Sequence, residues 1–164
     1  MNSKLISFDE MKKRTKEFYE SLDVIVSDEH IEEAVISLSM AQYVKEFNEN
    51  KNNINKNISL KNNHKALSTV GDAVCEAYWM LNKYRIDSSQ EILTDEKTIL
   101  RNDHLNIIGK KMLEGRLFAT NNDLDSNNEI ENKKSYATAF EAIIGFVSLI
   151  NLDKAFEILQ IYLK

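Results

Sequence analysis

The chain has 164 residues and a formal net charge of −5, with 21 Lys and Arg against 26 Asp and Glu. This length suits one domain with a single sizeable core. The acidic balance is unusual for a nucleic-acid-binding protein, although lysines gather between residues 45 and 65. The single cysteine excludes an internal disulfide, and no Cys/His pairs have the spacing of a structural zinc site. No segment resembles a signal peptide or a membrane span, so we expect a cytoplasmic protein with no membrane partner.

Proline is absent and glycine occurs four times, so long helices can run without a break. Apolar spacing predicts a helix over residues 8–22, which we interpret as an N-terminal helical extension covering residues 1–26. The main domain then covers residues 27–164. It opens with a helix over residues 27–41, and an Asn/Lys-rich stretch at about 48–63 predicts a mobile loop.

The strongest helical pattern lies between residues 64 and 83. We expect its core-facing side to carry Leu67, Val70, Val74, Cys75, Tyr78 and Leu81. A second side carries Ser68, Asp72, Glu76 and Lys83. The apolar neighbours of Cys75 indicate a core thiol rather than a reactive one.

The remaining segments are mostly helical. A helix is expected over residues 94–109, and residues 110–118 either extend it or form a short helix of their own. An acidic, Asn-rich loop follows at 119–132, and two closing helices cover 135–149 and 153–163. No strand pattern persists anywhere, so the sequence predicts an all-α fold.

Acidic residues on two of these helices suggest a metal site. Glu141 is the only charged residue between Ser135 and Leu152, and an unpartnered carboxylate in such an apolar helix costs several kcal/mol. Asp72 and Glu76 lie one turn apart on another helix, so Asp72 and Glu141 could share one Mg²⁺ if the helices pack together. Three alternatives stay open. Asp72 could be a surface or capping acid, Glu76 a solvated one, and Glu141 could pair with a buried Lys or Arg.

Three segments, in order, are similar to the ribonuclease III family. Residues 64–76, HKALSTVGDAVCE, resemble its signature helix N-E-R-L-E-F-L-G-D-A-V-L-E. Residues 97–105, KTILRNDHL, resemble its L-V-x-N-x-x-L segment, and residues 135–145, SYATAFEAIIG, resemble K-x-x-A-D-x-F-E-A-L-I-G. The likeness covers roughly residues 28–164 and leaves no room for a double-stranded-RNA-binding domain.

The resemblance implies that Asp72 and Glu141 are the metal ligands of a nuclease. Ser68 and Thr138 stand where the family has two further acids, and Lys65 replaces an earlier glutamate. The compact mini ribonuclease III branch also lacks acids at those two positions, and residues 137–142, ATAFEA, are close to its second helix.

The implied protein is a ribonuclease III-like helical bundle that cleaves double-stranded RNA in RNA processing. It would act as a homodimer with Mg²⁺, or Mn²⁺, held by Asp72 and Glu141 and supported by Glu76, Ser68 and Thr138. Candidate phosphate contacts are Lys65, Lys83, Arg85, Arg101, Lys110 and Lys111. A catalytically decayed, RNA-binding or ribosome-associated relative is the alternative, and a helical protein-interaction module is a third.

Overall fold

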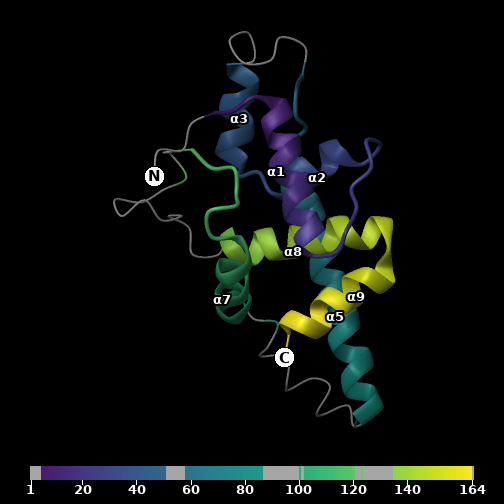
Figure 1. The fold of residues 1–164 in the computed structure, drawn as a ribbon. Helices are drawn as coiled ribbons and strands as arrows, with labels where there is room; N and C mark the ends of the chain where they lie inside the picture. Colours follow the sequence, from purple (N-terminus) through teal and green to yellow (C-terminus); the bar gives the residue numbers. More distant parts are fainter. Residues whose placement is uncertain are drawn as a thin grey trace.

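The computed structural model describes residues 5–50, 58–86, 100, 102–120, 123 and 135–163. Within these residues the protein is all-α (Figure 1). The helices are α1 (Phe8–Ser21), α2 (Ile31–Ser37), α3 (Ala41–Glu49), α5 (His64–Ile86), α7 (Asn102–Leu113), α8 (Ser135–Ile150) and α9 (Leu152–Tyr162). None of the described helices is long and apolar enough to cross a membrane.

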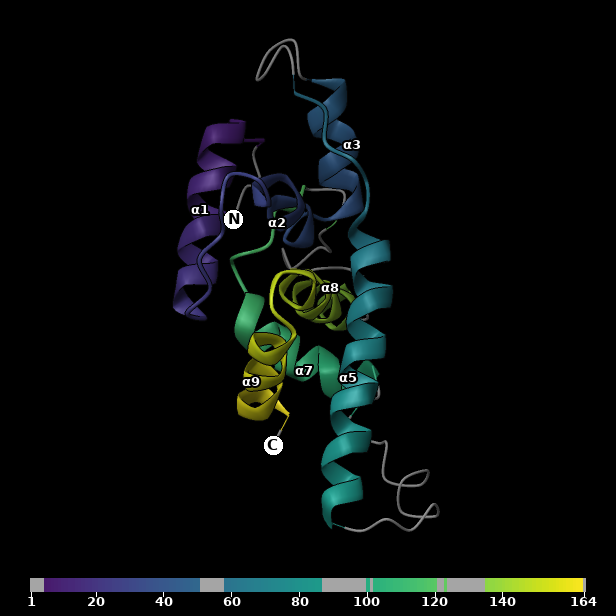
Figure 2. The same ribbon diagram turned by 90° about the vertical axis from the view of Figure 1, so that its right-hand side faces the viewer.

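Helix α8 forms the centre of the fold, with α5 and α7 packed against it (Figures 1 and 2). Almost every residue from Ser135 to Val147 is buried, Thr138 being the exception. Helix α8 is therefore buried on nearly all sides, as the apolar run of residues 135–149 predicted. Asn106 of α7 supports its first turn, because the Asn106 Oδ1 accepts a hydrogen bond from the Ala137 N–H at 3.3 Å.

Helix α1 packs into the same core. Met11, Phe18 and Tyr19 are buried in one hydrophobic cluster with residues of α8, and the rings of Tyr19 and Phe146 lie 5.1 Å apart. The Ser7 side chain accepts a hydrogen bond from the Glu10 N–H and so caps the start of α1. The N-terminal helix thus contributes large side chains to the core that α8 occupies.

The single helix expected over residues 27–41 is wrong, because the chain breaks between α2 and α3. The Phe118 N–H donates to the Leu38 carbonyl and the Met40 N–H to the Phe118 carbonyl, both at 2.8 Å. These long-range bonds use backbone groups that a continuous helix would have bonded internally. A segment eighty residues away in sequence therefore decides where α2 ends.

The expected core-facing side of α5 is also partly wrong. The residues of α5 that are buried are His64, Leu67, Gly71, Cys75 and Trp79. Cys75 is a core thiol, as predicted, but Val70 is 37% exposed and Leu81 49% exposed. Glycine at position 71 explains the difference, since it lets α5 approach α8 along a side that large side chains would have kept away.

The loops agree in part with the sequence. Asn48 belongs to α3, and its side chain makes two hydrogen bonds with the Leu60 backbone, at 2.8 and 2.9 Å. The described end of the expected 48–63 loop is therefore attached to α3. The helix predicted from residue 94 is described only from Asn102, and it continues to Leu113. Residues 94–99 and most of the acidic stretch at 119–132 lie outside the described residues.

Candidate metal centre at the crossing of α5 and α8

Two glycines bring α5 and α8 into backbone contact. A Cβ atom added to Gly71 would lie 1.6 Å from the carbonyl oxygen of Glu141, and one added to Gly145 would lie 2.0 Å from that of Leu67. Real side chains never approach so closely, so each position requires glycine. The crossing fixes the residues beside it, and these include Asp72 on α5 and Glu141 on α8.

The carboxyl groups of Asp72 and Glu141 meet at this crossing. They are close enough for Asp72 to affect the ionisation of Glu141, although Glu141 is only 7% exposed and Asp72 is exposed. Burial, the hydrogen bond to Asp72 and the charge of Asp72 together raise the pKa of Glu141 to about 8. Without a cation, Glu141 is therefore mainly protonated at neutral pH.

The geometry bears on two of the alternatives that the sequence left open. Asp72 is not a helix cap, because it lies in the middle of α5, but it is an exposed acid on the surface of that helix. No ion pair within the described part of the chain joins a Lys or Arg to Glu141. The buried acid has another acid as its neighbour. Such a pair accommodates two negative charges only when a cation offsets them.

Cys75 lies near the carboxyl pair, a position that the sequence analysis did not predict. Burial raises the pKa of its thiol, and the nearby charges of Glu141 and Asp72 raise it further. The thiol is 1% exposed and stays protonated. The signal in the sequence was its position, one turn after Gly71 on the side of α5 that faces α8.

The remaining predicted helper residues lie within one turn of the pair. Ser68 is half-buried one turn before Asp72, Thr138 is half-buried one turn before Glu141, and Glu76 is exposed one turn after Asp72. Ser68 and Thr138 are the positions at which the family resemblance expects two further acids. The chain has hydroxyl groups there instead.

The predicted phosphate contacts do not form one cluster. Lys65 is exposed in the first turn of α5, whereas Lys83 and Arg85 lie near its far end. Lys83 is eleven residues, or three turns, beyond Asp72 and shares its side of the helix, but Arg85 lies on the opposite side.

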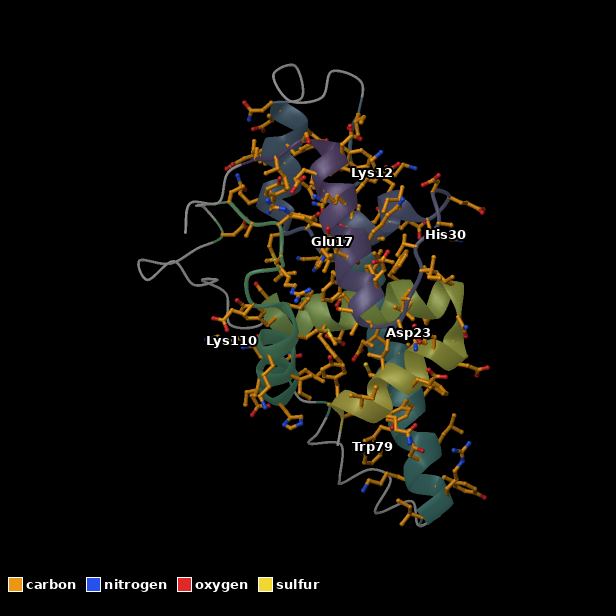
Figure 3. All side chains as sticks on the ribbon, in the orientation of Figure 1. Lys12, Glu17, Asp23, His30, Trp79 and Lys110 are labelled. Carbon is orange, nitrogen blue, oxygen red and sulfur yellow. The ribbon has the colours of Figure 1, made fainter. Side chains whose placement is uncertain are left out.

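Lys110 and Lys111 are in the last turn of α7. Figure 3 shows Lys110 well separated from the C-terminal half of α5, where Trp79 is labelled. Arg101 lies outside the described residues. The described basic side chains are therefore distributed over two helices.

The histidines do not supply further ligands. His64 is buried and its Nδ1 lies 3.1 Å from the Ile36 carbonyl oxygen, and burial lowers its pKa. Across the described residues, no three or more His, Cys, Asp or Glu side chains form a group that could hold a metal ion. The candidate site is a pair of carboxyl groups.

Comparison with known proteins adds no family: no protein-family model matches the chain, and no curated protein matches it.

Proposed function

We propose that this protein is a metal-dependent endoribonuclease of the ribonuclease III type that cleaves double-stranded RNA as a homodimer. One observation carries the proposal: the crossing at Gly71 and Gly145 puts the Asp72 carboxyl close enough to Glu141 to affect its ionisation. These are the two acids to which the family resemblance assigns metal binding. The closeness of the pair is a feature of the structure, and its catalytic use is our proposal.

The carboxyl pair suits Mg²⁺ or Mn²⁺. Mg²⁺ typically takes one or two protein carboxylates and completes its shell with water and substrate phosphate oxygens. Asp72 and Glu141 would hold the ion, which when bound activates water and offsets charge on a phosphodiester. A divalent cation would also offset the cost of burying a charged Glu141 and its repulsion by Asp72, so it favours the charged form of both carboxyls.

The surrounding residues would position the ion and the RNA. Ser68 and Thr138 can hydrogen-bond water in the metal's shell, and Glu76 can accept such a bond from one turn further along α5. Lys65 and Lys83 share the Asp72 side of α5 and would contact phosphates on either side of the pair. Lys110 and Lys111 would add contacts from α7. Recognition would depend on the shape and 2′-hydroxyls of the duplex.

The test is cleavage of a duplex RNA with Mg²⁺ by the parent protein, Asp72→Asn, Glu141→Gln and the control Glu114→Gln. Glu114 is an exposed acid beyond α7 and lies outside the proposed site. We expect the first two variants to lose at least about 100-fold in rate, because even outer-shell partners of a metal cost 10–100-fold. Equal cleavage by the parent and both site variants would overturn the proposal.

A second candidate function is that of a decayed relative that binds RNA without cleaving it. Ser68 and Thr138 favour it, as does the lack of a third ligand among the described acidic, histidine and cysteine side chains. Duplex RNA would then shift in a gel at low salt with no Mg²⁺-dependent products. Binding in either case should fall steeply with salt, because phosphate contacts release counterions. A protein that binds no duplex at low salt would instead be an interaction module.

A further inference from the structure

The outward side of α5 is an apolar surface without a cover among the described residues. Figure 2 shows α5 along one edge of the molecule, with its C-terminal half extending beyond the other helices. Small residues occupy this side in the first half of the helix, and large ones follow in the second half. The exposed or half-buried residues are Ala66, Thr69, Val70, Ala73, Ala77, Met80, Leu81 and Tyr84.

A groove with acidic edges lies beside the first half of this surface. It measures about 450 Å³ and lies between α2, the start of α5 and the end of α8. Its apolar wall includes Val70 and Leu149, which are 37% and 58% exposed. The acids Glu29, Glu32 and Glu33 also line it against the single base Lys61, and none of the three acids forms an ion pair within the described part of the chain. Such a groove suits an apolar side chain that carries a cation next to it.

The second half of α5 offers that combination. Leu81 is eleven residues, or three turns, after Val70, so both lie on the groove side of the helix. Arg85 follows Leu81 by one further turn and is exposed, and Tyr84 is 62% exposed. One end of α5 therefore carries the acid-edged groove, and the other end carries large apolar side chains beside an arginine.

We propose that the groove receives the C-terminal half of α5 from a second copy of this chain, with the two α5 helices antiparallel. This proposal rests on the homodimer of the proposed function and specifies its interface. Antiparallel pairing about the middle of α5 puts Ala73 opposite Ala77 of the partner subunit. It puts Ala66 opposite Tyr84 of the partner subunit. Small residues then meet at the crossing, and large ones meet small ones at both ends.

The antiparallel pairing also brings opposite charges together. A two-fold axis perpendicular to both helices keeps the groove side of one copy on the groove side of the other. Arg85 of the partner subunit then lies beside Glu29, Glu32 and Glu33. The same axis puts both copies of Asp72 on one face of the dimer, away from the grooves. Three carboxylates against the single Lys61 would repel a phosphate backbone, so RNA is not the occupant that the groove suits.

Charge reversal tests the proposed α5 interface. Dimer dissociation is measured by sedimentation equilibrium without RNA or metal. Arg85→Glu should weaken the dimer at least about tenfold, because it faces three carboxylates with a fourth. Glu32→Lys with Glu33→Lys should weaken it similarly, and combining all three changes should restore much of the affinity. The matched controls Lys13→Glu, and Glu17→Lys with Glu20→Lys, change exposed charges on α1 and should leave dissociation unchanged.

A covalent link provides the second measurement. Ala66→Cys combined with Tyr84→Cys should give a disulfide-linked dimer on mild oxidation, whereas each single variant should not. Cys75 is buried and needs no replacement. A dimer that neither the charge reversals nor the cysteines affect would overturn the α5 interface while leaving the nuclease proposal intact. A monomeric parent that cleaves RNA would overturn the homodimer and this interface together.

Discussion

Protonation of Glu141 links the stability of the protein to pH. Its pKa is 4.5 in the absence of structure and about 8 in the folded, metal-free protein. Between these values the folded state binds one proton more than the unfolded state. The stability that protonated Glu141 contributes to the folded state is therefore fully present below pH 4.5 and is lost as pH rises to 8. Glu141→Gln keeps the hydrogen-bond donor and removes the charge. We expect the free energy of unfolding of the variant, relative to that of the parent, to increase by a few kcal/mol between pH 5 and pH 9.

Urea unfolding in a chelating buffer measures this difference. Asp72→Asn is the companion variant. Burial is the largest cause of the raised pKa of Glu141, and this substitution acts on the smaller causes, the charge and hydrogen bonding of Asp72. Its stability should therefore depend less on pH than that of the parent. A constant difference between the parent and Glu141→Gln from pH 5 to pH 9 would show that folding does not raise the pKa of Glu141.

An unpaired hydroxyl in the core provides a prediction independent of function. Thr15 of α1 is fully buried, and no hydrogen-bond partner lies within reach of its Oγ1 in the described structure. Thr15→Val keeps the shape and removes the unsatisfied group, so it should stabilise the protein by about 1 kcal/mol. Thr15→Ser keeps the hydroxyl and loses the methyl group, and it should destabilise. Thermal unfolding of both variants beside the parent decides the matter, and a destabilised Thr15→Val would reveal a partner for the hydroxyl.

At the scale of elements, the crossing of α5 and α8 depends on two missing side chains. Gly71→Ala or Gly145→Ala would push a methyl group into the backbone of the facing helix, at 1.6 and 2.0 Å respectively. We expect each to cost about 3 kcal/mol or more, because neither helix can move without repacking the core. Gly115→Ala is the control: nothing lies within 4 Å of its Cβ position, and its φ of +77° costs about 1 kcal/mol.

Chemical denaturation compares the three glycine variants directly. In the two crossing variants the Asp72 and Glu141 carboxyls should also separate, so any Mg²⁺-dependent activity should fall with stability. Gly115→Ala should keep that activity. Equal, small losses of stability at all three positions would mean that α5 and α8 can separate without cost.

The same crossing shows how far the sequence could predict the fold. Apolar periodicity located α1, α5, α8 and α9 but not the break between α2 and α3, and the lone charge in residues 135–149 correctly indicated a buried acid. The core-facing side of α5 could not be found in this way, because α5 has two apolar sides. Val70 and Leu81 are as hydrophobic as core residues, whereas Gly71, which makes the closest contact, contributes no hydrophobicity at all. The pairing of Asp72 with Glu141 depended on that contact.

At the scale of the whole molecule, metal binding should stabilise the fold in a pH-dependent way. Both carboxyls must be ionised to hold Mg²⁺ or Mn²⁺, so binding below pH 8 displaces the proton of Glu141. Affinity should then fall about tenfold for each pH unit below 8. Because a ligand of the folded state alone raises stability by RT ln(1 + [L]/Kd), the rise in melting temperature at a fixed Mg²⁺ concentration should be larger at pH 8 than at pH 6.

Sodium chloride of equal ionic strength corrects for general screening, and Asp72→Asn and Glu141→Gln should lose the Mg²⁺-specific part of the rise in melting temperature. A rise of the same size in all three proteins would place the ion elsewhere on this acidic chain, and the carboxyl pair would then be a proton-sharing contact between two helices.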